Sequence, residues 1–429
     1  MATLPATPNT ALTPLAQGDR LFGWREHAAL WLSLGVGLLV MQIGAYLVPA
    51  LGAKQAAMVI VLGSMIGAGL LAWTAKIGCD SGLSSSGLMH ATYGSSFAKL
   101  PVLLNMVQLV GWTTFEIVVM RDGTMAIARQ SGGFAASIWP VLATLLWGGV
   151  LIALLSGSMV SLVRKFIGRF GLPLVIASLL WLSWQFLAKA NAQGLAAIWN
   201  KPGDGGMSTL SALDLVIAMP VSWLPLVADF ARHGRDGKST LRGTWLGYAI
   251  ANIWCYGLGV LVAITTPSTD LVAALLLAQG GLIALGLILI DEVDNAYGDL
   301  YSGSVAGHSL KPGWTVRRWG VLMAVVCTAL ALVLPMHSLE PFLLMLSSVF
   351  VPLYGVILAR LTGRANIAQL VDERKVNYSA VAIWFTGVIC YHACGQFMPS
   401  LGAALPTLVL TFVLARFTSD RPVRVAATA

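Results

Sequence analysis

Four carboxylates follow directly on an apolar run in the segment GLIALGLILIDEVDNAYGDLYSGSV, residues 281–305. Asp291, Glu292, Asp294 and Asp299 fall within nine residues, and no Lys or Arg lies among them. Side chains of this type at this density can bind a cation, carry protons or hydrogen-bond a polar ligand. They are therefore the first candidates for a functional site.

The aliphatic residues before these carboxylates predict a helix that enters a membrane. On insertion scales a central Asp costs roughly 2.5–3.5 kcal/mol, whereas each Leu or Ile returns only about 0.3–0.6 kcal/mol. Residues 281–290 cannot offset four carboxylates that face lipid. We therefore expect the acidic half to face a wet cavity, a bound cation or polar partners inside a helix bundle. The alternative is a cytoplasmic helix end whose charges are simply solvated.

A second group of polar residues lies in LLNMVQLVGWTTFEIVVM, residues 103–120. Gln108, Trp112 and Glu116 are spaced four residues apart, so they share one face of a helix. An indole, an amide and a carboxylate in line suit a flat heteroaromatic ligand, which would stack on the indole and hydrogen-bond to the other two groups. A Trp at this position could also serve packing alone.

Two further segments carry residues that break membrane helices. Residues 30–52 contain Gly35, Gly37, Gly44 and Pro49 around Gln42, and residues 213–234 contain Pro220 and Pro225. Proline removes a backbone donor and frees carbonyls of the preceding turn. Interrupted helices at matching positions of two halves indicate the substrate site of a transporter, with these segments as the first helices of two five-helix units. The alternative is an ordinary packing kink in each helix.

The composition places these segments in a membrane protein. Of the 429 residues, 57% are hydrophobic and 10% are charged, and the mean hydropathy is +0.79, whereas soluble domains contain about 25% charged residues. Continuous apolar runs recur along most of the length, which predicts an all-α polytopic membrane protein. The five cysteines lie mostly in apolar context and indicate no disulfide framework.

Twelve spans follow from the lengths of these runs and the breaker residues between them. They lie near 28–51, 55–76, 100–127, 135–157, 171–189, 211–231, 242–266, 280–306, 317–336, 341–361, 377–395 and 398–416. With a cytoplasmic N-terminus, 21 of the 26 Lys and Arg residues fall on the cytoplasmic side. This bias predicts twelve spans with both termini cytoplasmic, and it explains the net charge of +8 without a nucleic-acid partner. The expected location is a bacterial-type plasma (inner) membrane.

Three stretches of the chain resemble one protein family. Residues 76–112, KIGCDSGLSSSGLMHATYGSSFAKLPVLLNMVQLVGW, are similar to a G-x-x-x-G…R-x-x-[FY]-G…P…QxxGW pattern, and residues 227–238, VADFARHGRDGK, to A-D-[FY]-x-R-[FY]-x-R. The third stretch is LGL…DNA…LYS within residues 281–305. The family is nucleobase:cation symporter-1, the cytosine, purine and hydantoin permeases, and the resemblance covers roughly residues 20–415. The acidic DEVDNAYGDLYS looks most like the branch assigned to hydroxymethylpyrimidine, a thiamine precursor.

The resemblance implies a LeuT-type fold, in which a five-plus-five inverted repeat of helices is followed by two C-terminal helices. The expected divisions are a cytoplasmic tail 1–26, a first repeat 27–190, a second repeat 191–362, two additional spans 363–416 and a cytoplasmic tail 417–429.

The resemblance also implies roles for individual residues at a substrate site. Members of the family stack the substrate on a third-span Trp, here Trp112, and on a sixth-span aromatic residue, for which Trp223 is the nearest candidate. Gln42 looks like a further substrate contact of the family.

An ion site is implied in the same way. The backbone carbonyls of Leu38, Met41 and Ile288 match family sodium ligands, and Asp291 and Glu292 stand where the family has paired hydroxyls. Oxygen ligands suit a hard cation such as sodium, whereas a Glu in a membrane can equally carry a proton. The coupling ion is therefore sodium or a proton.

We interpret the chain as a secondary active transporter that imports a small planar pyrimidine, hydroxymethylpyrimidine first, by cation symport with alternating access. No cofactor and no metal beyond a sodium ion is expected. Trp112 and Trp223 would hold the ring between them. The residues expected to read its edges are Gln42, Gln108, Glu116 and Asn295, with Ser222 and Tyr297 as further candidates. A cytosine, purine or other nucleobase permease of the same family is the first alternative.

An enzyme is the alternative from another class. The pattern D-x-x-D-N-x-x-x-D, which starts at Asp291, is similar to the Mg²⁺-binding motifs of integral-membrane prenyl- and phosphotransferases. Such enzymes need paired carboxylates to hold the metal on a diphosphate, together with a second acidic cluster or nearby Arg for the phosphate charge. No second such cluster occurs in a predicted span, which favours the transporter.

Overall fold

The computed structural model describes residues 10–130, 138–157, 171–266, 271–334 and 339–418. Within these ranges the protein consists of helices and short connections, and the one β-type contact there is an isolated bridge between Phe22 and Gly234. The α-helices are α1 Trp24–Ser33, α2 Leu38–Leu51, α3 Ala53–Ser81, α4 Ser85–Tyr93, α5 Lys99–Gln130, α6 Ile138–Leu154, α8 Leu172–Ala192, α9 Leu195–Asn200, α10 Thr209–Ser222, α11 Leu224–Ala231, α12 Gly237–Thr265, α13 Leu271–Leu276, α14 Gly281–Leu310, α15 Val316–Val333, α16 Leu339–Leu361, α17 Tyr378–Phe397 and α18 Ala404–Phe417. Short 3₁₀ turns lie at Gln17–Asp19, Ile367–Val371 and Pro399–Leu401.

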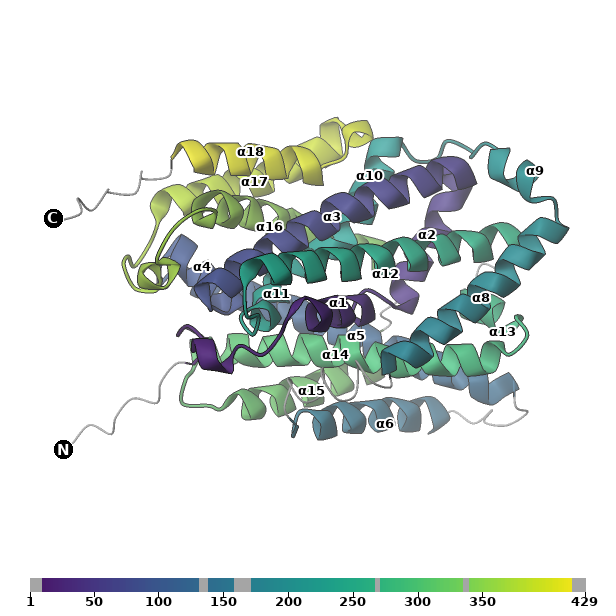
Figure 1. Ribbon diagram of the computed structural model, residues 1–429, viewed down its shortest axis with the longest axis horizontal. Helices are drawn as coiled ribbons and strands as arrows, with labels where there is room; N and C mark the ends of the chain where they lie inside the picture. Colours follow the sequence, from purple (N-terminus) through teal and green to yellow (C-terminus); the bar gives the residue numbers. More distant parts are fainter. Residues whose placement is uncertain (1–9, 131–137, 158–170, 267–270, 335–338, 419–429) are drawn as a thin grey trace.

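The long helices lie side by side along the longest dimension of the molecule (Figure 1). In this view α17 and α18 lie along one edge of the bundle and α6 and α15 along the opposite edge. The most extensive contacts join α3 to α12, α5 to α14, and α12 to both α1 and α2. The helices that carry the candidate site, α1, α2, α5 and α14, therefore belong to the packed interior of the bundle.

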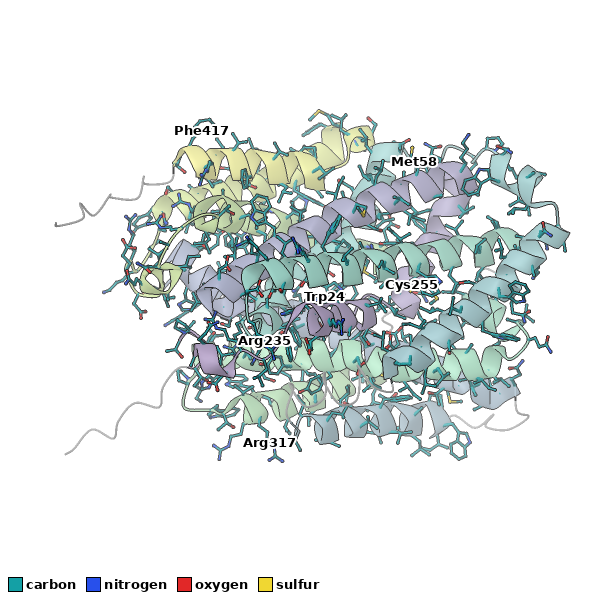
Figure 2. The ribbon with its side chains drawn as sticks, viewed as in Figure 1. Trp24, Met58, Arg235, Cys255, Arg317 and Phe417 are labelled. Carbon is teal, nitrogen blue, oxygen red and sulfur yellow. The ribbon has the colours of Figure 1, made fainter. Side chains whose placement is uncertain are left out.

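The outer helices present apolar side chains, as expected for a surface in contact with lipid. Met58 on α3 and Phe417 on α18 are 50% and 85% exposed, and both reach the periphery (Figure 2). Cys255 on α12, in contrast, is buried inside the bundle. All five cysteines are free thiols, which agrees with the sequence analysis.

A helix lies at each of the twelve expected spans. By length and composition, eight helices of the described ranges can cross a membrane, or nine spans if α1 and α2 are counted as one. The acidic α14 and the shorter α6 and α18 are not among them. The count of twelve spans, the five-plus-five repeat and its divisions therefore remain predictions. Parts of two expected spans, residues 135–137 and 335–336, lie outside the described residues, as do residues 1–9 and 419–429 of the expected tails. Five of the basic residues used for the orientation also lie outside them: Arg164, Lys165, Arg169, Arg421 and Arg424.

The first expected span is broken, as its glycines predict. α1 ends at Ser33, α2 begins at Leu38, and the two axes differ by 62°. The sixth expected span differs, because only Trp223 separates α10 from α11 and the two together form one span of 23 residues. Two prolines thus produce a local interruption here, whereas the residues between α1 and α2 redirect the chain.

Glycines let α2 and α12 approach each other closely. A Cβ atom on Gly259 of α12 would collide with the backbone carbonyl of Met41 on α2. A Cβ atom on Gly44 of α2 would likewise collide with the carbonyl of Tyr256 on α12. Backbone atoms cannot move aside as a flexible side chain can, so these two glycines fix the position of α2 beside the break.

We expect Gly259→Ala to lower stability because α2 and α12 must separate to admit the methyl group. Overpacking of this kind costs about 1–3 kcal/mol. A Cβ atom on Gly257 of the same helix would meet no neighbouring atom within 4 Å, so Gly257→Ala is the matched control. Thermal unfolding of the purified protein in detergent should show a lower Tm for Gly259→Ala only, and equal Tm values for both variants would contradict the close approach.

A buried carboxylate joins α10 to the C-terminal helix α18. The side chain of Asp214 is 6% exposed and accepts hydrogen bonds from the backbone N–H groups of Ala403, Ala404 (2.6 Å) and Leu405 (3.3 Å). These groups belong to the first turn of α18, whose N–H groups lack partners within the helix, and the negative charge complements the helix dipole.

We expect Asp214→Ala to lower the free energy of unfolding by about 1–3 kcal/mol, since it leaves buried donors without a partner. Asp236→Ala serves as the control, because Asp236 caps α12 through Ser239 N at 2.8 Å in an exposed position. The measurement is again Tm in detergent. A loss for Asp214→Ala no larger than that for Asp236→Ala would show that the contact with α18 contributes little.

Candidate functional site

A small cavity lies beside the break between α1 and α2. Its lining comes from the end of α1, the break, α2, α5, α10, Trp223 and α14. The lining residues are Leu34, Gly37, Leu39, Val40, Trp112, Glu116, Met219, Ser222, Trp223, Glu292, Asn295 and Asp299. The cavity volume is about 20 Å³, room for roughly one water molecule. The site is therefore closed around a very small space in this conformation.

The acidic half of α14 faces the interior of the bundle, as its insertion cost predicts. Asp291, Glu292, Asp294 and Asp299 are each 5% exposed or less. Glu292 and Asp299 line the cavity, together with Asn295 from the turn between them. The spacing of three and four residues places these three on one face of the helix.

The α14 side chains satisfy the backbone groups that the break leaves open. Glu292 Oε1 accepts a hydrogen bond from Leu38 N at 2.5 Å, at the first turn of α2. Asn295 Nδ2 donates to the carbonyl oxygen of Val36 at 3.0 Å. Because the start of a helix needs acceptors and the carbonyls of an interrupted helix need donors, one carboxylate and one amide hold the break in place.

Asp291 and Asp294, the other two carboxylates near the middle of α14, lie against α1 and do not line the cavity. Ser33 Oγ is 3.0 Å from Asp291 Oδ1 and 3.1 Å from Asp294 Oδ2. A hydroxyl has a single hydrogen and can donate fully to only one of these oxygens at a time. The second contact therefore calls for a proton on one carboxyl or a cation next to the pair.

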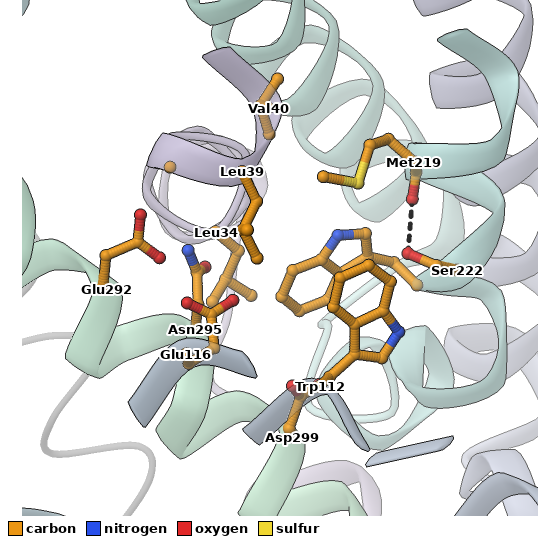
Figure 3. A pocket seen from close by; sticks show the side chains of 12 residues that line it. Leu34, Leu39, Val40, Trp112, Glu116, Met219, Ser222, Glu292, Asn295 and Asp299 are labelled. Atoms are coloured by element: carbon orange, nitrogen blue, oxygen red, sulfur yellow. Dashed lines mark hydrogen bonds between the residues drawn. The ribbon is translucent and has the colours of Figure 1, made fainter. Parts of the chain in front are cut away.

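Trp112 and Glu116 reach the cavity from α5. Trp112 is 6% exposed and packs edge-on against Phe342, with ring centroids 5.1 Å apart and an interplanar angle of 73°. Figure 3 shows Glu116, Asn295 and Glu292 on one side of the Trp112 ring and Met219 and Ser222 on the other. One face of the cavity is therefore acidic, and an aromatic ring separates it from the other face.

Glu116 and Glu292 both line the cavity. Oε2 of each carboxyl meets no donor within the described part of the chain. Both side chains are buried, with exposures of 5% and 1%. Two buried carboxyls that line the same small cavity need a proton, a cation or a donor from a ligand.

Gln108 does not line the cavity, although it shares a helix face with Trp112 and Glu116. Its Nε2 donates to Asn105 Oδ1 at 2.9 Å, and Asn105 Nδ2 donates to the carbonyl of Pro225 at 2.9 Å. Gln108 therefore supports α11 through Asn105. Its Oε1 has no partner among the described residues.

Five other predicted residues also lie away from the lining. Gln42 is half-buried on α2, and Tyr297 stacks on Tyr301 with ring centroids 6.4 Å apart. Leu38, Met41 and Ile288 are fully buried. None of the five is among the lining residues. Ser222 and Trp223 do line the cavity, and the Ser222 hydroxyl donates to the carbonyl of Met219 at 2.7 Å.

Asp299, one of the four candidate carboxylates of the sequence, lines the cavity because it follows Asn295 by one helical turn. Other contributors were not among the predicted residues, including Leu34, Gly37, Leu39 and Val40, which also line the cavity. Met219 lines it one turn before Trp223. Phe342 supports Trp112 from α16, and no local sequence signal connects two residues so far apart.

The N-terminal segment crosses the ends of α3 and α11. Phe22 N donates to the His233 carbonyl at 2.9 Å, and Arg235 N donates to the Phe22 carbonyl at 2.8 Å. Ser84 Oγ donates to the Ala11 carbonyl at 2.5 Å. Burial lowers the pKa of His233 to about 3, so its imidazole is neutral at physiological pH. The sequence predicts this end of the bundle to be cytoplasmic.

A helical membrane bundle with a first span broken beside a closed, polar cavity has the architecture of a secondary transporter. Residues 14–414 match the family described as permease for cytosine/purines, uracil, thiamine, allantoin, and the chain belongs to this family. The protein is therefore a transporter of nucleobase-like substrates. Because the family consists of permeases, the enzyme alternative based on the Asp-rich motif is wrong.

Comparisons with individual proteins agree with this assignment. The chain is 25% identical over 385 residues to the cytosine permease of Escherichia coli strain K12, covering 84% of each chain. Its fold is similar to that of Mhp1, a nucleobase-cation-symport-1 family transporter, in a closed conformation with bromovinylhydantoin bound, with a TM-score of 0.81, 16% identity, and coverage of 96% and 94%. MhsT in complex with L-phenylalanine also matches, with a TM-score of 0.61, 16% identity, and coverage of 91% and 98%.

Proposed function

We propose that the protein imports a small planar pyrimidine of the hydroxymethylpyrimidine type by cation symport with alternating access. It would act in a bacterial-type plasma membrane with both termini in the cytoplasm. The observation that carries this proposal is the cavity at the broken first span, which combines two tryptophans with buried carboxyls. Indole faces stack on flat rings, and the carboxyls read hydrogen-bonding groups at the ring edge.

The size of the cavity supports a mechanism with moving parts. A space of about 20 Å³ does not admit a pyrimidine ring, so the helices around it must separate for the substrate to enter. α2 begins at the cavity and is joined to α14 through Glu292 and Leu38. Opening would therefore change contacts at the carboxyls and at the aromatic face together, which is the requirement for coupling.

The driving cation, sodium or a proton, is proposed to bind at Asp291 and Glu292. Each of these carboxyls has one oxygen without a partner among the described residues. The carbonyls of Leu38, Met41 and Ile288 are proposed to complete the site when sodium is the ion. An ion at Glu292 would act on the start of α2 directly, because Leu38 N bonds to the same side chain.

Reconstitution of the full chain into liposomes tests the proposal. Labelled hydroxymethylpyrimidine should accumulate under an imposed inward gradient of sodium or of protons and should leak out when the gradient is collapsed. Accumulation that is equal with and without either gradient would rule out symport. Failure of any pyrimidine or purine to enter under any gradient would overturn the proposed function.

A cytosine or purine permease is the second candidate. It is favoured by the relation to the cytosine permease of Escherichia coli over 84% of the chain. Competition of unlabelled cytosine, adenine and hydroxymethylpyrimidine against one labelled ring distinguishes the candidates, since the physiological substrate should compete at the lowest concentration.

A further inference from the structure

The cavity offers hydrogen-bond acceptors to its ligand in excess of donors. We propose that it selects amino-substituted aromatic N-heterocycles, whose edge presents N–H groups, over otherwise identical rings that carry a carbonyl oxygen at that position. This inference rests on the proposed function and specifies its substrate class. It follows from the side chains that line the cavity and from the partners they already have.

The charge of the lining is one-sided. Glu116, Glu292 and Asp299 line the cavity, and no Lys, Arg or His is among its lining residues in the described part of the chain. A ligand with a negative charge or with carbonyl oxygens facing these carboxyls would be repelled. A neutral ring with N–H donors, or a protonated ring, would be attracted.

The neutral polar side chains add further acceptors because their donors are already in use. Asn295 Nδ2 donates to the carbonyl of Val36, which fixes the orientation of the amide. Asn295 Oδ1, 4% exposed as a residue, is left without a partner among the described residues. The Ser222 hydroxyl donates its hydrogen to the Met219 carbonyl and is therefore an acceptor toward a ligand. Among the fully buried side-chain atoms of this lining in the described ranges, the indole N–H of Trp112 is the one donor without a partner.

The position of Glu116 and Glu292 on the lining of one small cavity makes this demand for donors specific. Oε2 of each carboxyl has no donor among the described residues, and an ionised carboxylate can only accept. An exocyclic amino group has two N–H donors on one atom and can approach both carboxyls at once. A carbonyl oxygen at the same ring position has no hydrogen to offer, so it would leave Oε2 of both buried carboxyls without a donor.

Dioxo rings also carry N–H groups, but each of these is flanked by one or two carbonyl oxygens. Placing such an edge against the acidic face brings an acceptor against an acceptor. A site built to bond one ligand donor rejects an analogue that lacks it, because its buried groups remain unpaired. We therefore expect a preference for the amino ring of about 10-fold to 100-fold in affinity.

Matched pairs of rings test the inference on the full chain. In uracil the amino group of cytosine is replaced by a carbonyl and the neighbouring ring nitrogen gains a hydrogen, and hypoxanthine differs from adenine in the same way. Binding to the purified protein and competition for uptake into liposomes should both favour cytosine and adenine. Equal affinity within each pair, or preference for uracil and hypoxanthine, would overturn the inference and leave the proposed function standing.

Variants locate the preference at the acidic face. Glu116→Gln replaces one acceptor oxygen with an amide that donates, so the ratio of cytosine to uracil affinity should fall by about 10-fold. Glu373→Gln is the matched control, since Glu373 is an exposed side chain outside this cavity. Asp299→Asn gives a second reading at the cavity if Glu116→Gln folds poorly. An unchanged ratio in the cavity variants overturns the inference, and a lack of binding by every ring overturns the proposed function with it.

Discussion

Trp112→Ala will abolish uptake of the ring substrate. Loss of one aromatic stacking partner costs about 1–3 kcal/mol per base, and a change of 1.4 kcal/mol is about tenfold in affinity. Trp112 lines the cavity, is 6% exposed and is oriented by Phe342. Its removal also enlarges the cavity, so a bound ring would lose its fixed position relative to Glu116. We expect uptake at the background level and a Kd raised about 10-fold to 100-fold, measured in liposomes and by direct binding.

Two further variants separate stacking from general damage. Trp112→Phe keeps an aromatic face and should retain partial uptake. Trp184→Ala removes a Trp that is 68% exposed on α8 and should leave uptake unchanged. Gel filtration in detergent reports whether each variant folds. Uptake by folded Trp112→Ala at the wild-type rate would mean that the ring does not bind at this cavity.

The interior position of α14 could be predicted from the sequence because the physics is local. Four carboxylates after an apolar run cannot face lipid at any rotation of the helix, so the acidic half had to lie inside. The break near Gly35 and Gly37 could be predicted for a similar reason, because several helix-breaking Gly and Pro residues occur within the first expected span. Local composition sets a large energy in both cases, and no knowledge of the partner helix is needed.

The choice of lining residues could be predicted only in part. Periodicity groups Gln108 with Trp112 and Glu116, but it does not give the rotation of α5 or the partners that each side chain meets. Gln108 bonds to Asn105 three residues away, and Asn105 bonds to the carbonyl of Pro225 on α11, which is 120 positions away in the sequence. The same limitation applies to Ser33, whose contacts with Asp291 and Asp294 join α1 to α14.

The interruption at Trp223 shows how neighbouring helices decide the effect of a proline. Pro220 and Pro225 each remove a backbone donor, and the sequence predicts a break like that in the first span. Pro220 frees the carbonyl of Val216, four residues earlier, and this carbonyl accepts a hydrogen bond from the Tyr256 hydroxyl at 3.3 Å. At the interruption itself, the Pro220 carbonyl accepts from Trp223 N at 3.3 Å. With these carbonyls satisfied by partners, α10 and α11 continue as one span.

Glu292→Gln will change the dependence of uptake on the driving ion more than it changes folding. Glutamine keeps a carbonyl oxygen at the position of Oε1, so the hydrogen bond from Leu38 N, 2.5 Å in the wild type, can persist and hold the start of α2. The negative charge and the capacity to take up a proton are both lost. We therefore expect near wild-type expression and Tm, with uptake that no longer responds normally to the gradient.

The form of the defect identifies the ion. If sodium drives uptake, loss of one charged ligand should raise the sodium concentration for half-maximal uptake by about 10-fold or more, since a charge-assisted interaction contributes about 1.5–3 kcal/mol. If protons drive uptake, the variant should still exchange labelled for unlabelled substrate but should not concentrate it under a pH gradient, because the carboxyl that carries the proton is gone. Glu373→Gln is again the control for removal of a carboxylate elsewhere. A Glu292→Gln protein with wild-type dependence on both gradients would place the coupling ion away from the start of α2, and the link between ion and cavity through Leu38 would then have to be abandoned.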